Sequence, residues 1–298
     1  MRWIRDFDQD QTLSRQFRIA LAITLAGNAI LALIKIAAAR VSHSSAIYSD
    51  AINSISDVLY SLLLIFGLWL SQRPPDLSHP QGHSRFEPIV SMIVTLSMAI
   101  AGIEAMRASI SRFLEGGSSI PLGIPLAALG SSIAIKALMY VLVEKISKTT
   151  SSPGLSAAAH DNLSDVFTSL AALTGIIGTQ IIHPVLDPLA GIFVALWIFK
   201  TVIRTARENL GYITGAGADE VLREKIVNAV KNIDGIENIH LLLTDYTGPK
   251  LVVEMHINVD GNKSLNESHA ISDAAIMALE NLQEVDRAYV HVEPIGHV

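Results

Sequence analysis

The sequence predicts an all-α transmembrane bundle of six helices followed by a small α+β domain. Half of the 298 residues are hydrophobic and only 17% are charged, which is typical of a chain that crosses a membrane several times. Six apolar stretches reach the roughly 20 residues needed to span a bilayer. After residue 211 the composition becomes that of a soluble, acidic domain. We therefore predict an N-terminal segment 1–16, a transmembrane domain 17–211 and a C-terminal domain 212–298.

The order and charge of the apolar stretches predict how the chain crosses the membrane. An even number of spans puts both ends of the bundle on one side. Ten Lys and Arg residues flank the spans on the side of the termini and three on the other side, and positive residues stay in the cytoplasm. Both termini, and the segment 1–16, are therefore expected to be cytosolic. The protein itself is expected in an inner or plasma membrane. The six predicted spans are residues 17–39, 46–70, 88–112, 121–144, 156–181 and 184–206.

The C-terminal domain contains 14 acidic and 6 basic residues, a net charge of −8, whereas the whole chain carries −6. Its hydrophobic pattern predicts five elements in the order αββαβ, which suits a small sheet with its helices on one face. The predicted elements are helix 218–232, strand 236–244, strand 250–259, helix 266–281 and strand 286–293.

Alternation along the predicted strands separates a buried face from an open face. In strand 250–259 five apolar residues occupy every second position and would face the helices, so His256 would point the other way. His240 alternates with Ile239 and Leu241 in the first strand. In the last strand His291 and Glu293 alternate with valines. We therefore expect three histidines and a glutamate on the open face. The five apolar residues are Leu251, Val253, Met255, Ile257 and Val259.

Two pairs of polar residues with the same spacing lie inside predicted spans. Asn53 and Asp57 are four residues apart in the second span, and Asp161 and Asp165 are four apart in the fifth, so each pair lies on one helical face. An ionisable residue within a span costs roughly 2.5–3.5 kcal/mol on insertion scales. If the two spans pack together, the three carboxylates would repel unless protons or a divalent cation neutralise them. This predicts a site that exchanges a cation for protons.

A purely structural role for these polar residues stays open. They can be helix-end residues at the water interface, or polar contacts between helices. Asp50, one turn before Asn53, is placed around the site rather than in it. His160 adjoins Asp161 but lies about 100° round the helix, so it is expected to face away from the pair.

A second candidate site lies between the second and third spans. Asp76, His79 and His83 fall within eight residues of a cytoplasmic loop and supply one carboxylate and two imidazoles. The alternative is a solvated loop whose turns are set by Pro80 and Gly82. The chain has no cysteine, so every metal ligand must be oxygen or imidazole. Nucleophile elbows, zincin helices and phosphate-binding glycine loops are absent from the sequence, so we expect no enzyme. No organic cofactor and no nucleic-acid partner is expected.

These motifs resemble those of the cation diffusion facilitators, a family of divalent metal/proton antiporters, over nearly the whole chain. The resemblance implies a homodimer, a transport site between the second and fifth spans, and a ferredoxin-like cytosolic domain that binds metal. It places His269 with His240, His256, His291 and Glu293 in the cytosolic metal site. His269 is on a helix away from the open face, and reaches a metal only near the dimer interface. The motifs, in the family's order, are "SDAINSISD", "DLSHPQGHSRFE", "HDNLSD" and "DPLAG".

The transport site departs from that of the zinc-transporting members, which have His then Asp in the fifth span. Here Asp161 takes the first position, so the site is similar to the oxygen-only, manganese-type sites. Carboxylate and carbonyl oxygens suit Mn²⁺, with Fe²⁺, Zn²⁺, Co²⁺ and Cd²⁺ as further substrates. We therefore expect proton-coupled efflux of divalent cations by alternating access, with the metal also acting as a regulator. The alternative is a membrane-anchored metal sensor or channel without proton coupling.

Overall fold

The computed structural model describes residues 3–4, 11–42, 45–116, 124–181 and 185–296. At some positions within these ranges, including residues 45–53, only the backbone is described. The chain divides into two compact units, residues 1–209 and 210–298.

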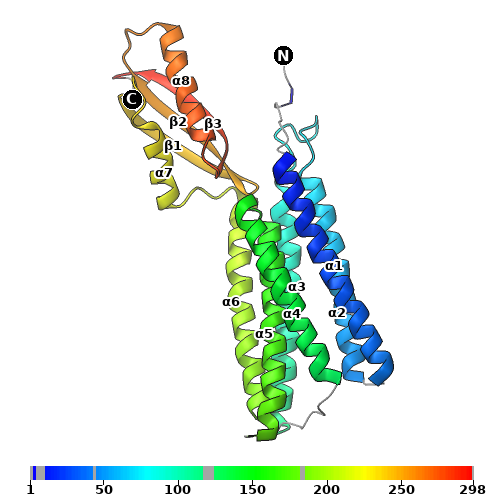
Figure 1. Cartoon of the computed structure of the whole chain (residues 1–298). Coiled ribbons are helices and arrows are strands. Elements are labelled where there is room, and N and C mark those ends of the chain that lie inside the picture. The colour runs from blue at the N-terminus through cyan, green and yellow to red at the C-terminus, as the bar shows by residue number, and fades with distance from the viewer. Residues whose placement is uncertain (1–2, 5–10, 43–44, 117–123, 182–184, 297–298) are drawn as a thin grey trace. The chain divides into compact units, whose positions relative to one another are not determined.

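Six long helices make up the first unit, and the last of them ends a few residues inside the second (Figure 1). Several of them extend beyond the apolar stretches seen in the sequence, because their ends continue as polar helical turns. The helices are α1 Gln11–Ser42, α2 Ser45–Ser71, α3 Phe86–Leu114, α4 Ile124–Thr150, α5 Pro153–Ile181 and α6 Leu186–Thr214.

Three of these helices are long and apolar enough to cross a membrane, counting only residues that the structure describes: Ser14–Ala38 in α1, Phe86–Leu114 in α3 and Leu126–Thr150 in α4. In α2 a shorter apolar stretch, Asp57–Ser71, follows a more polar first half.

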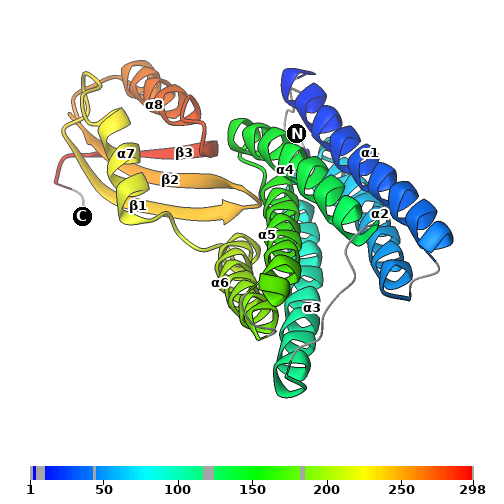
Figure 2. The same cartoon turned by 60° about the horizontal axis from the view of Figure 1, so that its bottom comes forward.

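The helices of the α1–α2 pair are joined to α5 through both α4 and α3. Helix α1 packs against α2 and α4, α4 packs against α5, and α3 packs against both α2 and α5. Figures 1 and 2 both show α1 and α2 side by side at one edge, with α5 and α6 at the other. Close approach needs small residues: a Cβ on Gly27 of α1 would lie 2.2 Å from the sulfur of Met139 in α4.

The end of the bundle at the α2–α3 loop is held by a buried carboxylate. Glu87, in the first turn of α3, accepts a hydrogen bond from the hydroxyl of Ser152 and another from the backbone N–H of Gly154 at 3.4 Å. Ser152 in turn accepts from the backbone N–H of Leu155 at 3.1 Å, so it caps α5. Proline at position 153 is favoured in the first turn because the turn needs no N–H there. The start of α5 is thereby fixed to the start of α3.

The second unit is a three-stranded sheet with two helices. Strand β2 pairs antiparallel with β1 and parallel with β3, so β2 is central. The expected αββαβ order is confirmed, with small shifts at the element ends. The elements are α7 Glu220–Val230, β1 Asn238–Thr247, β2 Lys250–Val259, α8 Leu265–Glu280 and β3 Val285–Pro294.

One face of this sheet forms the core of the unit. Leu251, Val253, Met255 and Ile257 are fully buried and pack with Ile226 of α7 and other residues of the two helices. The predicted alternation in β2 is therefore confirmed. A capping box formed by Ser264 and Glu267 begins α8.

Candidate metal sites

A buried lysine joins the polar residues of the second and fifth helices. Lys136 of α4 places its Nζ 2.7 Å from Oδ2 of Asp165 in α5 and 3.1 Å from Oδ2 of Asp57 in α2. Its side chain is only 4% exposed, whereas that of Asp165 is 34% exposed. A single ammonium group thus contacts both carboxylates, although they belong to different helices.

The third predicted carboxylate belongs to the same electrostatic cluster. Asp161, one turn before Asp165, interacts electrostatically with Asp165, Lys136 and Asp57. Lys35 of α1 also acts on Asp57. Because ionised carboxylates repel each other and attract positive charge, this group of side chains is a candidate cation site. We call Asp57, Asp161, Asp165 and Lys136 the membrane cluster.

Two further predicted residues, Asn53 in the site and Asp50 around it, precede Asp57 in α2. The backbones of Asp50 and Asn53 lie in α2, in the turns before Asp57, but their side chains lie outside the described residues.

His160 lies against α6. Its Nδ1 is 2.8 Å from the carbonyl oxygen of Ser156, and its Nε2 is 2.8 Å from Nη2 of Arg204. A guanidinium can only donate, so Nε2 accepts and Nδ1 carries the proton that it donates to Ser156. Both ring nitrogens of His160 are therefore hydrogen-bonded, Nδ1 within α5 and Nε2 to α6.

The loop between α2 and α3 brings its three predicted ligands together. Oδ1 of Asp76 is 3.6 Å from Nδ1 of His79, and Oδ2 is 3.5 Å from Nε2 of His83. All three ligand atoms of this group lie within 4.8 Å of one another. A cation between them would need only small side-chain movements to reach typical bond lengths of about 2.0–2.2 Å.

Backbone N–H groups hold the Asp76 carboxylate of this loop in place. Oδ1 of Asp76 accepts the N–H of His79 at 2.7 Å and that of Ser78 at 2.9 Å. These hydrogen bonds, first that from His79, lower the pKa of the Asp76 carboxyl below its usual value of 3.8. The carboxylate therefore stays ionised at neutral pH. Nδ1 of His83 is buried and has no hydrogen-bond partner among the described residues, whereas Nε2 is the ring nitrogen that faces Asp76.

The open face of the C-terminal sheet carries a third group, centred on a glutamate. The carboxylate of Glu293 is 3.2 Å from Nδ1 of His256, 3.3 Å from Nε2 of His240 and 3.4 Å from Nε2 of His291. His256 and His291 are register partners on parallel strands, and Glu293 is the partner of Asn258. The group thus offers three imidazoles and one carboxylate, which is a ligand set suited to zinc and similar metals. We call these four residues the sheet cluster.

A β-bulge gives His240 its position. Ile239 pairs with Ile257 and Leu241 pairs with His256, so His240 is the extra residue in β1. Ile239 and Leu242 both pack on the core, which a regular strand would forbid. Leu241 therefore is the partner of His256, and the expectation that it alternates onto the helix face with Ile239 is wrong. Nδ1 of His240 donates to Oδ1 of Asn258 at 3.1 Å, which leaves Nε2 toward Glu293.

His269 lies apart from the sheet cluster within this chain. It is 73% exposed on α8, and its Nε2 is 3.5 Å from Oδ2 of Asp273, one turn later. The part of the C-terminal unit that the structure describes groups only His240, His256 and Glu293 tightly enough for a metal.

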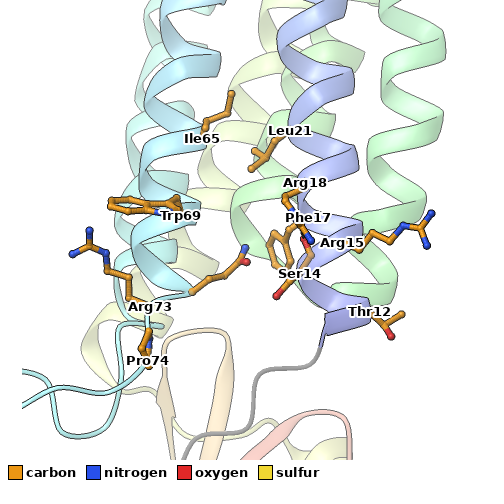
Figure 3. Close-up of a pocket in the computed structure, with 11 residues that line it drawn as sticks. Thr12, Ser14, Arg15, Phe17, Arg18, Leu21, Ile65, Trp69, Arg73 and Pro74 are labelled. Atoms are coloured by element: carbon orange, nitrogen blue, oxygen red, sulfur yellow. Dashed lines mark hydrogen bonds between the residues drawn. The ribbon is translucent and has the colours of Figure 1, made fainter.

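A large cavity lies elsewhere, between the ends of α1 and α2 at the α2–α3 loop. It has a volume of about 840 Å³ and is lined by Phe17 and Leu21 of α1 and by Ile65 and Trp69 of α2, with Arg73 over the Trp69 ring at 3.9 Å (Figure 3). Among the described residues that line it, none is acidic and three are arginines, Arg15, Arg18 and Arg73.

Comparison with known proteins decides the family. Residues 21–214 match the family described as the cation efflux transmembrane domain, and residues 218–295 match the cation efflux protein cytoplasmic domain. The chain belongs to the cation diffusion facilitator family. It is therefore an integral membrane protein of a family of transporters.

Relatives of this cation diffusion facilitator include named manganese exporters. The uncharacterized transporter MJ0449 of Methanocaldococcus jannaschii is 34% identical over 94% of this chain and 99% of its own length. The manganese efflux system proteins MneS and MneP of Bacillus subtilis are 26% and 27% identical. They cover 92% and 93% of this chain, and 94% and 95% of their own lengths. These relatives support divalent metal efflux.

The sequence did not single out Lys136 as part of this site. Only the structure brings it to Asp57 and Asp165. The available signal was a single charge in the middle of an apolar helix, where a retained ionisable residue needs a partner.

Proposed function

We propose that the protein is a proton-coupled exporter of divalent cations, with Mn²⁺ as its main substrate. The observation that carries the proposal is the meeting of Asp57, Asp161 and Asp165 around Lys136, from three helices. The names of the relatives MneS and MneP support manganese as the cargo. In this proposal all six long helices span the membrane and both termini are cytoplasmic.

The membrane cluster would work as an exchange site. A cation from the cytoplasm binds the oxygens of Asn53, Asp57, Asp161 and Asp165 and leaves on the other side. Without it, the ammonium of Lys136 offsets only one of the three carboxylate charges in a low-dielectric environment, so protons neutralise the remaining charge during the return. The helix bundle would expose the site alternately to each side by rocking around it.

The ligand set favours harder cations. Carboxylate and amide oxygens suit Mn²⁺, and the imidazole of His160, next to Asp161 in the chain, is engaged with Arg204 and the Ser156 carbonyl. Fe²⁺, Zn²⁺, Co²⁺ and Cd²⁺ are further substrates of such a site, since affinity alone does not exclude them.

The two other groups would regulate transport. In a homodimer of ferredoxin-like cytosolic domains, metal at the sheet cluster offsets the repulsion between two acidic domains and stabilises the closed dimer. His269 would join such a site only from the dimer interface. Asp76, His79 and His83 would form a separate loop site.

Flux into proteoliposomes tests the proposal. With the full chain reconstituted, Mn²⁺ should move into the liposomes in exchange for protons that move out down their gradient. Asp57→Asn or Asp165→Asn should reduce Mn²⁺ flux to that of empty liposomes. Glu104→Gln is the matched control, since it removes an exposed carboxylate from α3 of the same unit. Wild-type flux in both aspartate variants would overturn the exchange site.

The same variants separate the alternative of a membrane-anchored sensor or channel. A sensor should bind Mn²⁺ at its C-terminal domain and show no flux in the wild type. A channel should conduct Mn²⁺ down its gradient without acidifying or alkalising the lumen. Proton movement coupled to Mn²⁺, measured with a pH-sensitive dye, is expected only of the exporter.

A further inference from the structure

We propose that Lys136 is a tethered competitor for the transport site. Its ammonium group occupies the carboxylates of the empty site and withdraws when a divalent cation binds. This inference rests on the proposed transport function, and it assigns a specificity- and affinity-setting role to a residue of α4.

Geometry makes the lysine and the cation mutually exclusive. Nζ of Lys136 lies 2.7 Å from Asp165 and 3.1 Å from Asp57, so it takes a carboxylate oxygen from each of the two helices. A divalent cation would need the same carboxylates at about 2.0–2.2 Å. It would then lie within a few ångströms of the ammonium, and like charges at that separation in a buried site repel strongly. The ammonium must therefore move for the cation to bind.

The structure also offers a place for the ammonium to go. Ser132 lies four residues before Lys136, on the same face of α4, and its hydroxyl is buried without a hydrogen-bond partner among the described residues. Oδ1 of Asn28 in α1 is buried and equally without a described partner. Nδ2 of Asn28 donates to the backbone oxygen of Asp57 at 3.4 Å, so this amide lies beside the membrane cluster.

These two oxygens favour a second position of the lysine. A buried acceptor left without a donor costs about 1–3 kcal/mol, and an ammonium is a donor with three protons and no acceptor. The four-carbon stem of lysine has enough rotatable bonds to swing the group along its helix. Withdrawal from Asp57 and Asp165 would therefore satisfy Ser132 and Asn28 instead of leaving the ammonium unpaired.

The consequence is a moderated affinity. Part of the binding free energy of the cation goes to displacing Lys136, and the returning ammonium helps to expel the cation at release. A site with the same carboxylates but without the lysine would hold Mn²⁺ more tightly and release it more slowly.

Mn²⁺ binding to the full chain in detergent tests this, by the loss of the electron paramagnetic resonance signal of free Mn²⁺. The background carries Asp76→Asn and Glu293→Gln, so that the loop and the sheet cluster do not dominate the signal. We expect Lys136→Met to raise Mn²⁺ affinity at least tenfold and to slow efflux, whereas Lys136→Arg stays within about threefold of the wild type. Lys148→Met, an exposed lysine of the same helix, should change neither.

Ser132→Ala is an independent test that leaves every charge in place. It removes the acceptor that receives the ammonium, so it should weaken Mn²⁺ binding severalfold. Because it deletes an unpaired buried hydroxyl, folding should not suffer. Unchanged or weaker binding in Lys136→Met would overturn the inference, and so would unchanged binding in Ser132→Ala.

Failure of this inference is distinguishable from failure of the transport site. If Asp57→Asn abolishes Mn²⁺ binding but the Lys136 and Ser132 variants bind as the wild type does, only the competitor role is lost. If Asp57→Asn binds Mn²⁺ as tightly as the wild type, the transport site itself is wrong, and the role of Lys136 is overturned with it.

Discussion

Glu293→Gln should remove most of the stabilisation that metal gives to the C-terminal domain. Three imidazole nitrogens lie within 3.2–3.4 Å of this one carboxylate, so it is the centre of the sheet cluster and the only carboxylate among its four residues. Glutamine keeps the shape but removes the charge. Even a residue that only supports a metal ligand is worth about 10–100-fold in affinity, so loss of this carboxylate should raise Kd by about 100-fold.

The size of the effect follows from linkage. At a free metal concentration of 100 times the wild-type Kd, binding stabilises the folded domain by about 2.7 kcal/mol. Backbone amides that exchange only when the domain opens should then exchange about 100-fold more slowly. With Kd raised about 100-fold, the same concentration gives about 0.4 kcal/mol, and exchange slows only about twofold.

Hydrogen exchange of β2 in the full chain measures this difference, because Met255 and Ile257 lie in the centre of the buried face. Glu224→Gln on the exposed side of α7 is the matched control and should respond to metal as the wild type does. If Glu293→Gln shows the same metal-dependent slowing as the wild type, the sheet cluster is not a metal site.

Three further predictions concern other residues. Asp161→His adds an imidazole to the membrane cluster and should raise Zn²⁺ over Mn²⁺ in competitive vesicle uptake; unchanged selectivity would contradict the oxygen-only reasoning. Ser264→Ala removes the cap of α8 and should lower the stability of the C-terminal domain by about 0.5–2 kcal/mol in denaturant titrations, against no change if the cap is unimportant. Hydrogen bonds from Lys225 lower the pKa of Glu284 below 4.5, so this carboxylate contributes stability above about pH 4.5 that is lost as pH falls through its lowered pKa. Glu284→Gln should flatten the acid side of the pH–stability curve by under about 1 kcal/mol, because the pair is partly exposed; an unchanged curve would show that the pair contributes nothing.

Local patterns predicted the C-terminal domain well. Alternation fixed the buried face of β2, and with it the direction of His256, because side chains on a strand have a strict period of two. The bulge at His240 was beyond this reasoning. An inserted residue leaves no mark in a run of leucines, so the sequence assigned Leu241 to the wrong face.

The helical unit was harder to predict because its chemistry comes from long-range packing. Spacing showed that Asp161 and Asp165 share a face, which is a property of one helix. Which helix supplies the opposing charge depends on how the helices are arranged. Nothing in the neighbourhood of Lys136 along the chain pointed to Asp57 or Asp165, which are 79 and 29 residues away.

The carboxylate of Glu87 fastens the first turn of α5, the helix that carries Asp161 and Asp165, to α3. Asp57 is carried by α2, which packs against both α1 and α3. A tilt of α2 relative to α5 would draw Asp57 away from the other two aspartates. The cation would then be released because its ligands on α2 and α5 separate, and no additional gate would have to open.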